Sequence, residues 1–452
     1  MTERVRAWLS APRDAAALVV FRVAFGLLVS VSATRFLVYG WVEQLFDTKF
    51  QFHYFGFGWV PHPGLEGVRL LFVALVVLGA MVALGALYRF SIIALFVAFA
   101  WLQLLDVSNY LNHYYLVTLL ALLSCFMPLH VMWSVDAWLR PSVQSQTLPM
   151  WCTALLRFQV GVVYFFAGLA KLNGDWLVHG APLHLWLSAR TSMPVVGPYL
   201  SMPEVALFMS WAGFLFDSSV PFFLMWRRAR PFAFVAVILF HTATRALFPI
   251  GMFPFIMTLS ALVFFDSSWP RKWLRQGALP HPRPSPRGRG SPLLPLLAAY
   301  VAFQLVLPLR AHFYGGDVSW HEQGMRFSWR VMTREKNGSV TYIVKNRATG
   351  REWHVAPSDY LTRVQERELA VQPDLILQLG HHIGRDFEQR GLGPVEVRAD
   401  TLVSLNGRAA TPLVDARVDL MTLQDSSRGS DWIAPPTEGP PLSALRRALA
   451  HF

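Results

Sequence analysis

The chain has 452 residues, of which 54% are apolar and only 15% are charged. Because ordinary soluble domains carry roughly 25% charged residues, this composition excludes a wholly water-soluble protein. The formal net charge is +12, yet residues 310–452 hold 18 Lys and Arg against 17 Asp and Glu. The excess therefore lies in the loops of the apolar part, where the positive-inside rule explains it, and we expect no nucleic-acid partner.

Nine apolar runs approach the length of about 17–25 residues that crosses a bilayer. They cover residues 15–34, 67–88, 90–105, 114–133, 153–170, 205–226, 231–248, 250–266 and 291–309. The first run follows a short basic stretch and lacks an A-x-A-like cleavage site, so it predicts a retained helix rather than a signal peptide. Residues 1–309 are therefore predicted to form an α-helical polytopic membrane domain of about nine spans, in contact with membrane lipid.

The number of spans decides where the rest of the chain lies. With nine spans and the basic loops inside, the N-terminus is cytoplasmic and residues 310–452 face the periplasm or an organelle lumen. Leu279–Pro292 combines prolines, glycines and arginines, and it predicts an inner-face linker before the last span. Cys125 and Cys152 lie in or beside apolar runs and predict neither a disulfide nor a zinc site.

Residues 310–452 predict an extracytoplasmic α+β domain that is rich in strands. An antiparallel meander is expected from segments with many β-branched and aromatic residues, at Phe327–Thr333, Ser339–Lys345 and Glu352–Val355, with turns at Lys336–Gly338 and Arg347–Gly350. A helical stretch is expected near residues 358–390. A further strand is expected near residues 395–405, closed by Asn406-Gly407.

The most unusual polar residues end an apolar run at Tyr164–Trp176, with the sequence YFFAGLAKLNGDW. Lys171 and Asp175 stand at the margin of hydrocarbon, where an ionisable residue is costly and is a candidate functional group. If the helix continues through them, Tyr164, Lys171 and Asp175 share one face. Under the predicted topology four more polar residues reach the same outer face, namely Asn112, His113, His241 and Arg245. This convergence predicts a site between the membrane helices and the outer domain.

Each of these residues also has a purely structural interpretation. Lys171 can extend to the lipid headgroups, Asp175 can simply neutralise Lys171, and Arg245 can pair with a lipid phosphate. The Asn112-His113 pair can cap a turn.

The remaining polar residues and the missing motifs favour catalysis by a general base over catalysis by a metal or a nucleophilic triad. Arg22, inside the first run, is expected to pair structurally with a neighbouring helix. The chain has no Gly-rich phosphate loop, no H-E-x-x-H pair and no G-x-S-x-G elbow. His381-His382 is a lone pair and a poor metal site, so no metal is expected. An enzyme with this sequence is expected to use a general base.

At these residues the chain resembles the vitamin K-dependent γ-glutamyl carboxylase family over most of its length. YFFAGLAKLNGDW is similar to the family's Y-F-x-A-G-x-x-K-L-x-x-D-W segment, which contains its catalytic lysine. Six further motifs resemble family segments: NHYYL (Asn112–Leu116), WSVD (Trp133–Asp136), FHTATRALFPIGMF (Phe240–Phe253), FSWRVM (Phe327–Met332), VSLNGR (Val403–Arg408) and DARVDL (Asp415–Leu420). The animal enzymes have two adjacent lysines at Ala170-Lys171, a structural disulfide without counterpart here, and several hundred further residues.

The resemblance implies an HTTM-type membrane domain and a reaction at Lys171. A vitamin K hydroquinone of the menaquinol or phylloquinol type is oxidised to its epoxide with O₂, and this is coupled to γ-carboxylation of glutamate with CO₂. Neutral Lys171 is implied to remove a phenolic proton while Asn112 and His113 hold the quinone oxygens. Burial favours a neutral lysine. Because an ionised Asp175 nearby would oppose this, we expect Asp175 to point away or to stand at the entrance.

The resemblance also implies which groups bind the substrates. Positions expected to line the quinone pocket are Tyr164, His241, Ile250 and Phe253. The meander around Ser328 and Trp329 is expected to present a glutamate-containing protein or peptide.

Two other functions stay open from the sequence. An enzyme on the same fold that performs only the epoxidation, or acts on another quinone, needs the same base. A non-catalytic membrane scaffold or receptor would use the outer domain to bind a partner, and Lys171 together with Asn112-His113 argues against it.

Overall fold

The protein is described by a computed structural model that covers residues 3–275, 293–424 and 431–441. The predicted linker Leu279–Pro292 lies outside the described residues. Each of the nine apolar runs falls on a helix, and these helices are α2 (Ala16–Val38), α4 (Gly64–Leu84), α5 (Tyr88–Leu105), α6 (Asn112–Phe126), α8 (Met150–Ala170), α12 (Pro203–Met225), α13 (Arg230–Leu247), α14 (Phe253–Ala261) and α16 (Leu293–Leu309). The predicted class of α-helical polytopic membrane protein is confirmed.

Six helices of the described chain are long and apolar enough to cross a bilayer, fewer than the nine expected. They are α2, α4, α5, α8, α12 and the segment Pro295–Phe313, which contains most of α16. The count of six rests on length and composition alone, and the other three predicted spans fall short of those two requirements. Helices α6 and α14 are shorter than a bilayer-crossing helix, and the 18 residues of α13 include Arg230, His241 and Arg245.

Short elements connect these helices. The helices are α1 (Glu3–Ser10), α3 (Trp41–Phe46), α7 (Val135–Leu139), α9 (Gly174–Leu177), α10 (Ala181–Ser188), α11 (Gly197–Leu200), α15 (Trp269–Trp273) and α17 (Val318–His321), and the 3₁₀ turns include η1 (Val107–Asn109) and η4 (Arg310–Phe313). Strands β1 (Pro12–Asp14) and β2 (Thr147–Pro149) form a small antiparallel pair.

Close helix contacts in the membrane part depend on small residues. A Cβ atom at Gly26 of α2 would lie 2.5 Å from the carbonyl oxygen of Gly79 in α4, so only glycine allows the two backbones to approach this closely. Buried Arg22 donates hydrogen bonds to three backbone carbonyl groups, those of Ala83, Leu129 and Trp133. These contacts agree with the structural role that was expected for Arg22.

The outer domain is a three-stranded antiparallel sheet with two helices. The strand order is β4 (Glu352–Val355), β3 (Lys336–Asn346), β5 (Val395–Leu405). Helix α18 (Arg363–Leu369) precedes α19 (Pro373–Gln389), which packs against β5. The expected strand at 395–405 is confirmed, because its buried positions alternate with more accessible ones as one sheet face requires.

Three local predictions for this domain are wrong. Phe327–Thr333 is a succession of turns, with left-handed backbone at Phe327, Trp329 and Met332. Its aromatic residues, typical of strands, are instead buried against the membrane helices. Lys336–Gly338 belongs to β3 rather than to a turn. The helical stretch near 358–390 is divided into α18 and α19, and Pro373 begins the second helix.

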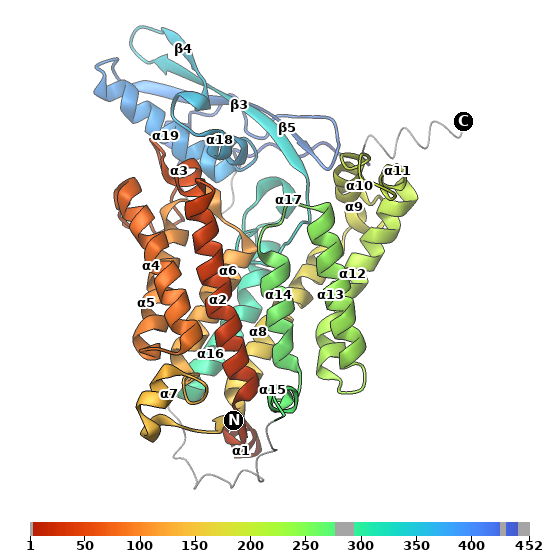
Figure 1. Cartoon of the computed structure of the whole chain (residues 1–452). Helices are drawn as coiled ribbons and strands as arrows, with labels where there is room; N and C mark the ends of the chain where they lie inside the picture. The colour runs from red at the N-terminus through yellow and green to blue at the C-terminus, as the bar shows by residue number, and fades with distance from the viewer. Residues whose placement is uncertain (1–2, 276–292, 425–430, 442–452) are drawn as a thin grey trace.

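The N-terminal helix α1 and the outer domain lie at opposite ends of the helical bundle (Figure 1). Hydrogen bonds fasten the outer domain to the bundle. Gln365 of α18 donates to the Asp106 carboxylate at the end of α5, at 2.7 Å. Gln378 of α19 bonds with both backbone groups of His53, at 2.9 and 3.0 Å. These contacts hold the sheet and its helices above the ends of the spans.

Candidate active site

A cavity lies where α8, α12, α13 and α14 meet the turns that precede β3. Its lining consists of Val163, Tyr164, Ala167, Lys171, Trp176, Leu183, Met209, Gly213, Asp217, Phe240, His241, Thr244, Phe248, Ile250, Phe253, Met257, Val331 and Met332. The walls are mostly apolar. The few polar side chains come from α8 and the residue that follows it, from α12 and from α13. The free volume is about 90 Å³, so a ring compound enters only if lining side chains move.

Lys171 is the first residue beyond α8, which ends at Ala170. Its Nζ donates to three oxygens: Asp217 Oδ2 at 2.9 Å, the Ala167 carbonyl at 3.1 Å and the Val331 carbonyl at 3.3 Å. The side chain is only 6% exposed, so Lys171 does not extend to the lipid headgroups. The contact with Val331 joins the membrane helices to the turns that lead into the outer domain.

Asp217 of α12 is the partner of Lys171, and the sequence analysis missed it. Its side chain is 8% exposed, so the ion pair is almost fully buried. Placing two charges in so dry a position is costly unless each neutralises the other. The signal was present, because a carboxylate inside an apolar run requires a partner, but the sequence does not say which spans are neighbours.

Asp175 points away from Lys171. The helix was expected to continue through both residues, but α8 ends at Ala170 and Asn173 caps the separate helix α9. Asp175 instead accepts two hydrogen bonds of 2.7 Å from Arg408 and one of 2.7 Å from Asn406. Partial burial opposes ionisation, but these hydrogen bonds prevail and lower the pKa of Asp175. Asp175 therefore fastens the turn after Lys171 to the outer domain.

Tyr164 and His241 form a second polar pair in the cavity. The Tyr164 hydroxyl and His241 Nε2 lie 2.9 Å apart, and both residues are buried. The other ring nitrogen of His241, Nδ1, is buried without a partner among the described residues. Ile250 and Phe253 line the same cavity, as the sequence hypothesis placed them. An uncharged polar ligand atom would satisfy the vacant nitrogen.

Asn112 and His113 begin α6 and face different surroundings. The His113 ring lies 6.1 Å from the ring of Phe253, at the edge of the cavity but outside its lining. Asn112 Oδ1 accepts from Tyr110 at 3.0 Å, and the Tyr110 hydroxyl accepts from the Phe327 backbone N–H at 2.8 Å. Asn112 lines an adjacent polar groove, which shares Met332 with the Lys171 cavity.

Ser328 and Trp329 do not line the Lys171 cavity. The Ser328 hydroxyl donates to the Met325 carbonyl. Trp329 is fully buried and stacks on Tyr115, with ring centroids 4.9 Å apart. The same turns place Val331 and Met332 in the cavity wall instead. Arg245 lies 5.0 Å above the Phe255 ring and donates to the Gly251 carbonyl at 3.4 Å.

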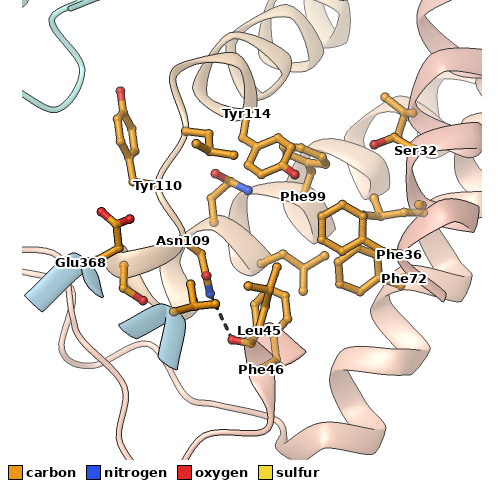
Figure 2. Close-up of a pocket in the computed structure, with 18 of the residues that line it drawn as sticks. Ser32, Phe36, Leu45, Phe46, Phe72, Phe99, Asn109, Tyr110, Tyr114 and Glu368 are labelled. Carbon is orange, nitrogen blue, oxygen red and sulfur yellow. Dashed lines mark hydrogen bonds between the residues drawn. The ribbon is translucent and has the colours of Figure 1, made fainter. Parts of the chain in front are cut away.

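A second cavity lies at the outer ends of α2, α4 and α5, under α18 (Figure 2). Its lining is Val29, Ser32, Ala33, Phe36, Leu45, Phe46, Phe72, Leu75, Phe99, Leu102, Gln103, Ser108, Asn109, Tyr110, Leu111, Tyr114, Val364, Arg367 and Glu368. No described residue lines both this cavity and the one around Lys171.

Comparison with known families decides what kind of protein this is. The model of the HTTM domain matches residues 10–269, more than half of the chain. The chain belongs to the HTTM family. The model of the lumenal domain of vitamin K-dependent gamma-carboxylase matches residues 290–439. Together the two matches make this HTTM protein a vitamin K-dependent carboxylase-like membrane protein, in agreement with the predicted resemblance. No solved structure matches the chain.

The HTTM protein shows no cluster of three or more metal-binding side chains within residues 3–275, 293–424 and 431–441. His381 bonds with the Leu420 carbonyl at 2.8 Å, and His382 lies 4.6 Å from the Phe50 ring. These contacts give both histidines a place in the outer domain's packing.

Proposed function

We propose that this protein oxidises a reduced vitamin K with O₂ to its epoxide at the Lys171 cavity, coupled to γ-carboxylation of a protein glutamate with CO₂. The observation that carries the proposal is the buried Lys171–Asp217 ion pair, which stands in an apolar cavity between membrane helices. A buried ionisable pair in such a cavity is typical of catalytic sites. The match to the lumenal domain of vitamin K-dependent gamma-carboxylase supports the proposed substrate class.

The residues present fit a neutral ring compound. The lining is apolar apart from a few groups, and His241 Nδ1 lacks a partner that a ligand oxygen or hydroxyl can provide. The three methionines of the lining, Met209, Met257 and Met332, have flexible side chains that can make room for a ring. Tyr164, His241, Ile250 and Phe253 would hold the ring system of reduced vitamin K.

Reduced vitamin K, when bound, supplies a phenolic hydroxyl and the electrons that O₂ accepts. The protein must take the proton of that hydroxyl. Lys171 Nζ donates to the Asp217 carboxylate at 2.9 Å, and in this proposal the pair starts as an ammonium and a carboxylate. Lys171 therefore works as a relay: it gives one Nζ proton to Asp217 Oδ2 and receives the proton of the hydroxyl. The pair as a whole is the base, Lys171 stays positively charged beside the developing negative charge, and the site's net charge does not change.

The glutamate is proposed to arrive from the outer domain side. The polar groove beside the cavity is lined by Asn112 and by three arginines, and it meets the cavity at Met332. Arg326 and Arg334 already pair with Asp374 and Glu322, so Arg330 is the arginine of the groove that would meet a substrate carboxylate. Arginine side chains are well suited to carboxylates. His113, next to Phe253, is placed to shield or contact the ring. In this proposal Ser328 and Trp329 support the turn that forms the groove rather than touch the substrate.

The orientation in the membrane is part of the proposal. The N-terminus and the outer domain lie at opposite ends of the bundle (Figure 1). Basic residues in loops at the N-terminal end favour the cytoplasm for that end, and in this proposal the outer domain faces the periplasm or a lumen.

The experiment is product analysis with purified protein in lipid nanodiscs, given reduced vitamin K, O₂, labelled CO₂ and a glutamate-rich peptide. We expect vitamin K epoxide and label in the peptide. Epoxide without label would reduce the function to epoxidation alone. Neither product, with vitamin K shown to bind, would leave the scaffold or receptor function and refute the proposal. The double variant Lys171→Met/Asp217→Leu, which leaves no uncompensated buried charge, is the matched control for background oxidation.

A further inference from the structure

The second cavity is separate from the Lys171 cavity and lies across the start of α6 from it. His113 is directed toward Phe253 of the Lys171 site, with ring centroids 6.1 Å apart. The next residue, Tyr114, lines the second cavity. The two spaces therefore flank one helix end and share no described lining residue. The polar groove between them shares Ser108, Tyr110 and Glu368 with the second cavity and Met332 with the Lys171 cavity.

Aromatic rings form much of the second cavity (Figure 2). The rings of Phe36 and Phe72 stack at 4.8 Å, and Tyr114 lies 6.3 Å from Phe36 and 6.1 Å from Phe99. The free volume is about 270 Å³, three times that of the Lys171 cavity at about 90 Å³. These rings are in contact with one another and form aromatic walls, on which a planar ring can pack by its face or its edge.

Three uncharged polar side chains line this apolar space without a partner. Ser32, Gln103 and Tyr114 make no side-chain hydrogen bond to any described residue. All three side chains are half-buried, and a ligand with oxygen atoms in the cavity would supply the hydrogen bonds that the described residues do not. The charged residues of the described lining are Arg367 and Glu368, which pair with each other at 3.3 Å.

We propose that this cavity binds a second lipid quinone, by its ring. The aromatic walls suit a planar ring, and the hydroxyl and amide groups suit its oxygens. A phospholipid headgroup fits less well, because the lining offers no unpaired cation for its phosphate. The cavity opens at the membrane end of the outer domain, where a lipid-soluble ring is available. The proposal goes beyond the proposed function and assigns no chemistry to this site.

The test is the number of menadione molecules bound per chain. Menadione is an oxidised, tail-less naphthoquinone, so it does not turn over. Equilibrium dialysis of the full chain in quinone-free nanodiscs, corrected with empty nanodiscs, is expected to give two saturable equivalents. Ala33→Phe fills the second cavity and should leave one. Ala167→Phe, a matched substitution in the Lys171 cavity, should also leave one.

A third variant keeps the test decisive if a bulky substitution disturbs folding. Tyr114→Phe removes only a hydroxyl and should weaken one class of sites about fivefold, the value of one neutral hydrogen bond. Two equivalents in Ala33→Phe would overturn the proposal. The proposal would also be overturned if the wild type bound one equivalent of menadione and Ala167→Phe abolished that binding. In that case the proposed quinone site at Lys171 would still stand. A loss of copurified phospholipid rather than menadione in Ala33→Phe would show an acyl lipid instead.

Discussion

The Lys171–Asp217 pair makes a quantitative prediction about stability. The two side chains are 6% and 8% exposed, so replacing one partner leaves an uncompensated buried charge. Breaking a pair of this kind costs about 3–5 kcal/mol. Lys171 also donates to the Ala167 and Val331 carbonyls, which lose a donor in Lys171→Met. We therefore expect Lys171→Met and Asp217→Leu each to lower the free energy of unfolding by about 3–5 kcal/mol.

The double variant Lys171→Met/Asp217→Leu should behave differently. Both charges are gone and both replacements are apolar, so its stability should lie within about 1.5 kcal/mol of the wild type. The assay is unfolding in mixed micelles, followed by circular dichroism, for all four proteins. Losses that simply add in the double variant would show that the two residues do not interact and would refute the reasoning.

Three further predictions concern the outer domain. Burial lowers the pKa of Lys336 to about 8. The unfolded chain, with a lysine pKa near 10.4, binds more protons than the folded chain between these values, so stability should rise by up to about 3 kcal/mol across that pH window. Lys336→Met should abolish the rise in melts taken against pH. Arg408→Ala removes the bidentate partner of Asp175 and should lower the free energy of unfolding by about 1.5–3 kcal/mol. Adding Asp175→Asn to Arg408→Ala should restore much of that loss, because no unpaired carboxylate then remains. A reporter fused after Phe452 should behave as periplasmic or lumenal, and cytoplasmic reporter activity would reverse the topology.

Local patterns were sufficient for much of the fold. The nine apolar runs all lie on helices, and β5 was placed correctly because Val395, Val397 and Ala399 alternate toward the core. Phe327–Thr333 was misread because aromatic and β-branched residues favour strands only where a sheet surface is available to them. Here Trp329 packs against Tyr115 of the membrane part, a contact between residues more than 200 positions apart that no local pattern reveals.

The candidate site shows the same limit. Lys171 could be found from the cost of an amine at the end of an apolar run. Its partner could not, because Asp175 was the nearest carboxylate in sequence while Asp217 is the nearest in space. Tyr164 and Lys171, which belong to one sequence motif, line the same cavity. Ser328 and Trp329, which were expected to present the glutamyl peptide, do not line the Lys171 cavity, whereas Val331 and Met332 of the same turns do.

The most direct test of the central claim is epoxide formation by the double variant Lys171→Met/Asp217→Leu, compared with the wild type under reduced vitamin K and O₂. The variant keeps the packing of the site but lacks its proton relay. We predict epoxide from the wild type and a rate lower by at least about 10² in the variant, the usual contribution of a positioned base. Mass spectrometry of the extracted quinones gives both rates. Equal epoxide from a variant whose melting curve matches the wild type would contradict the account.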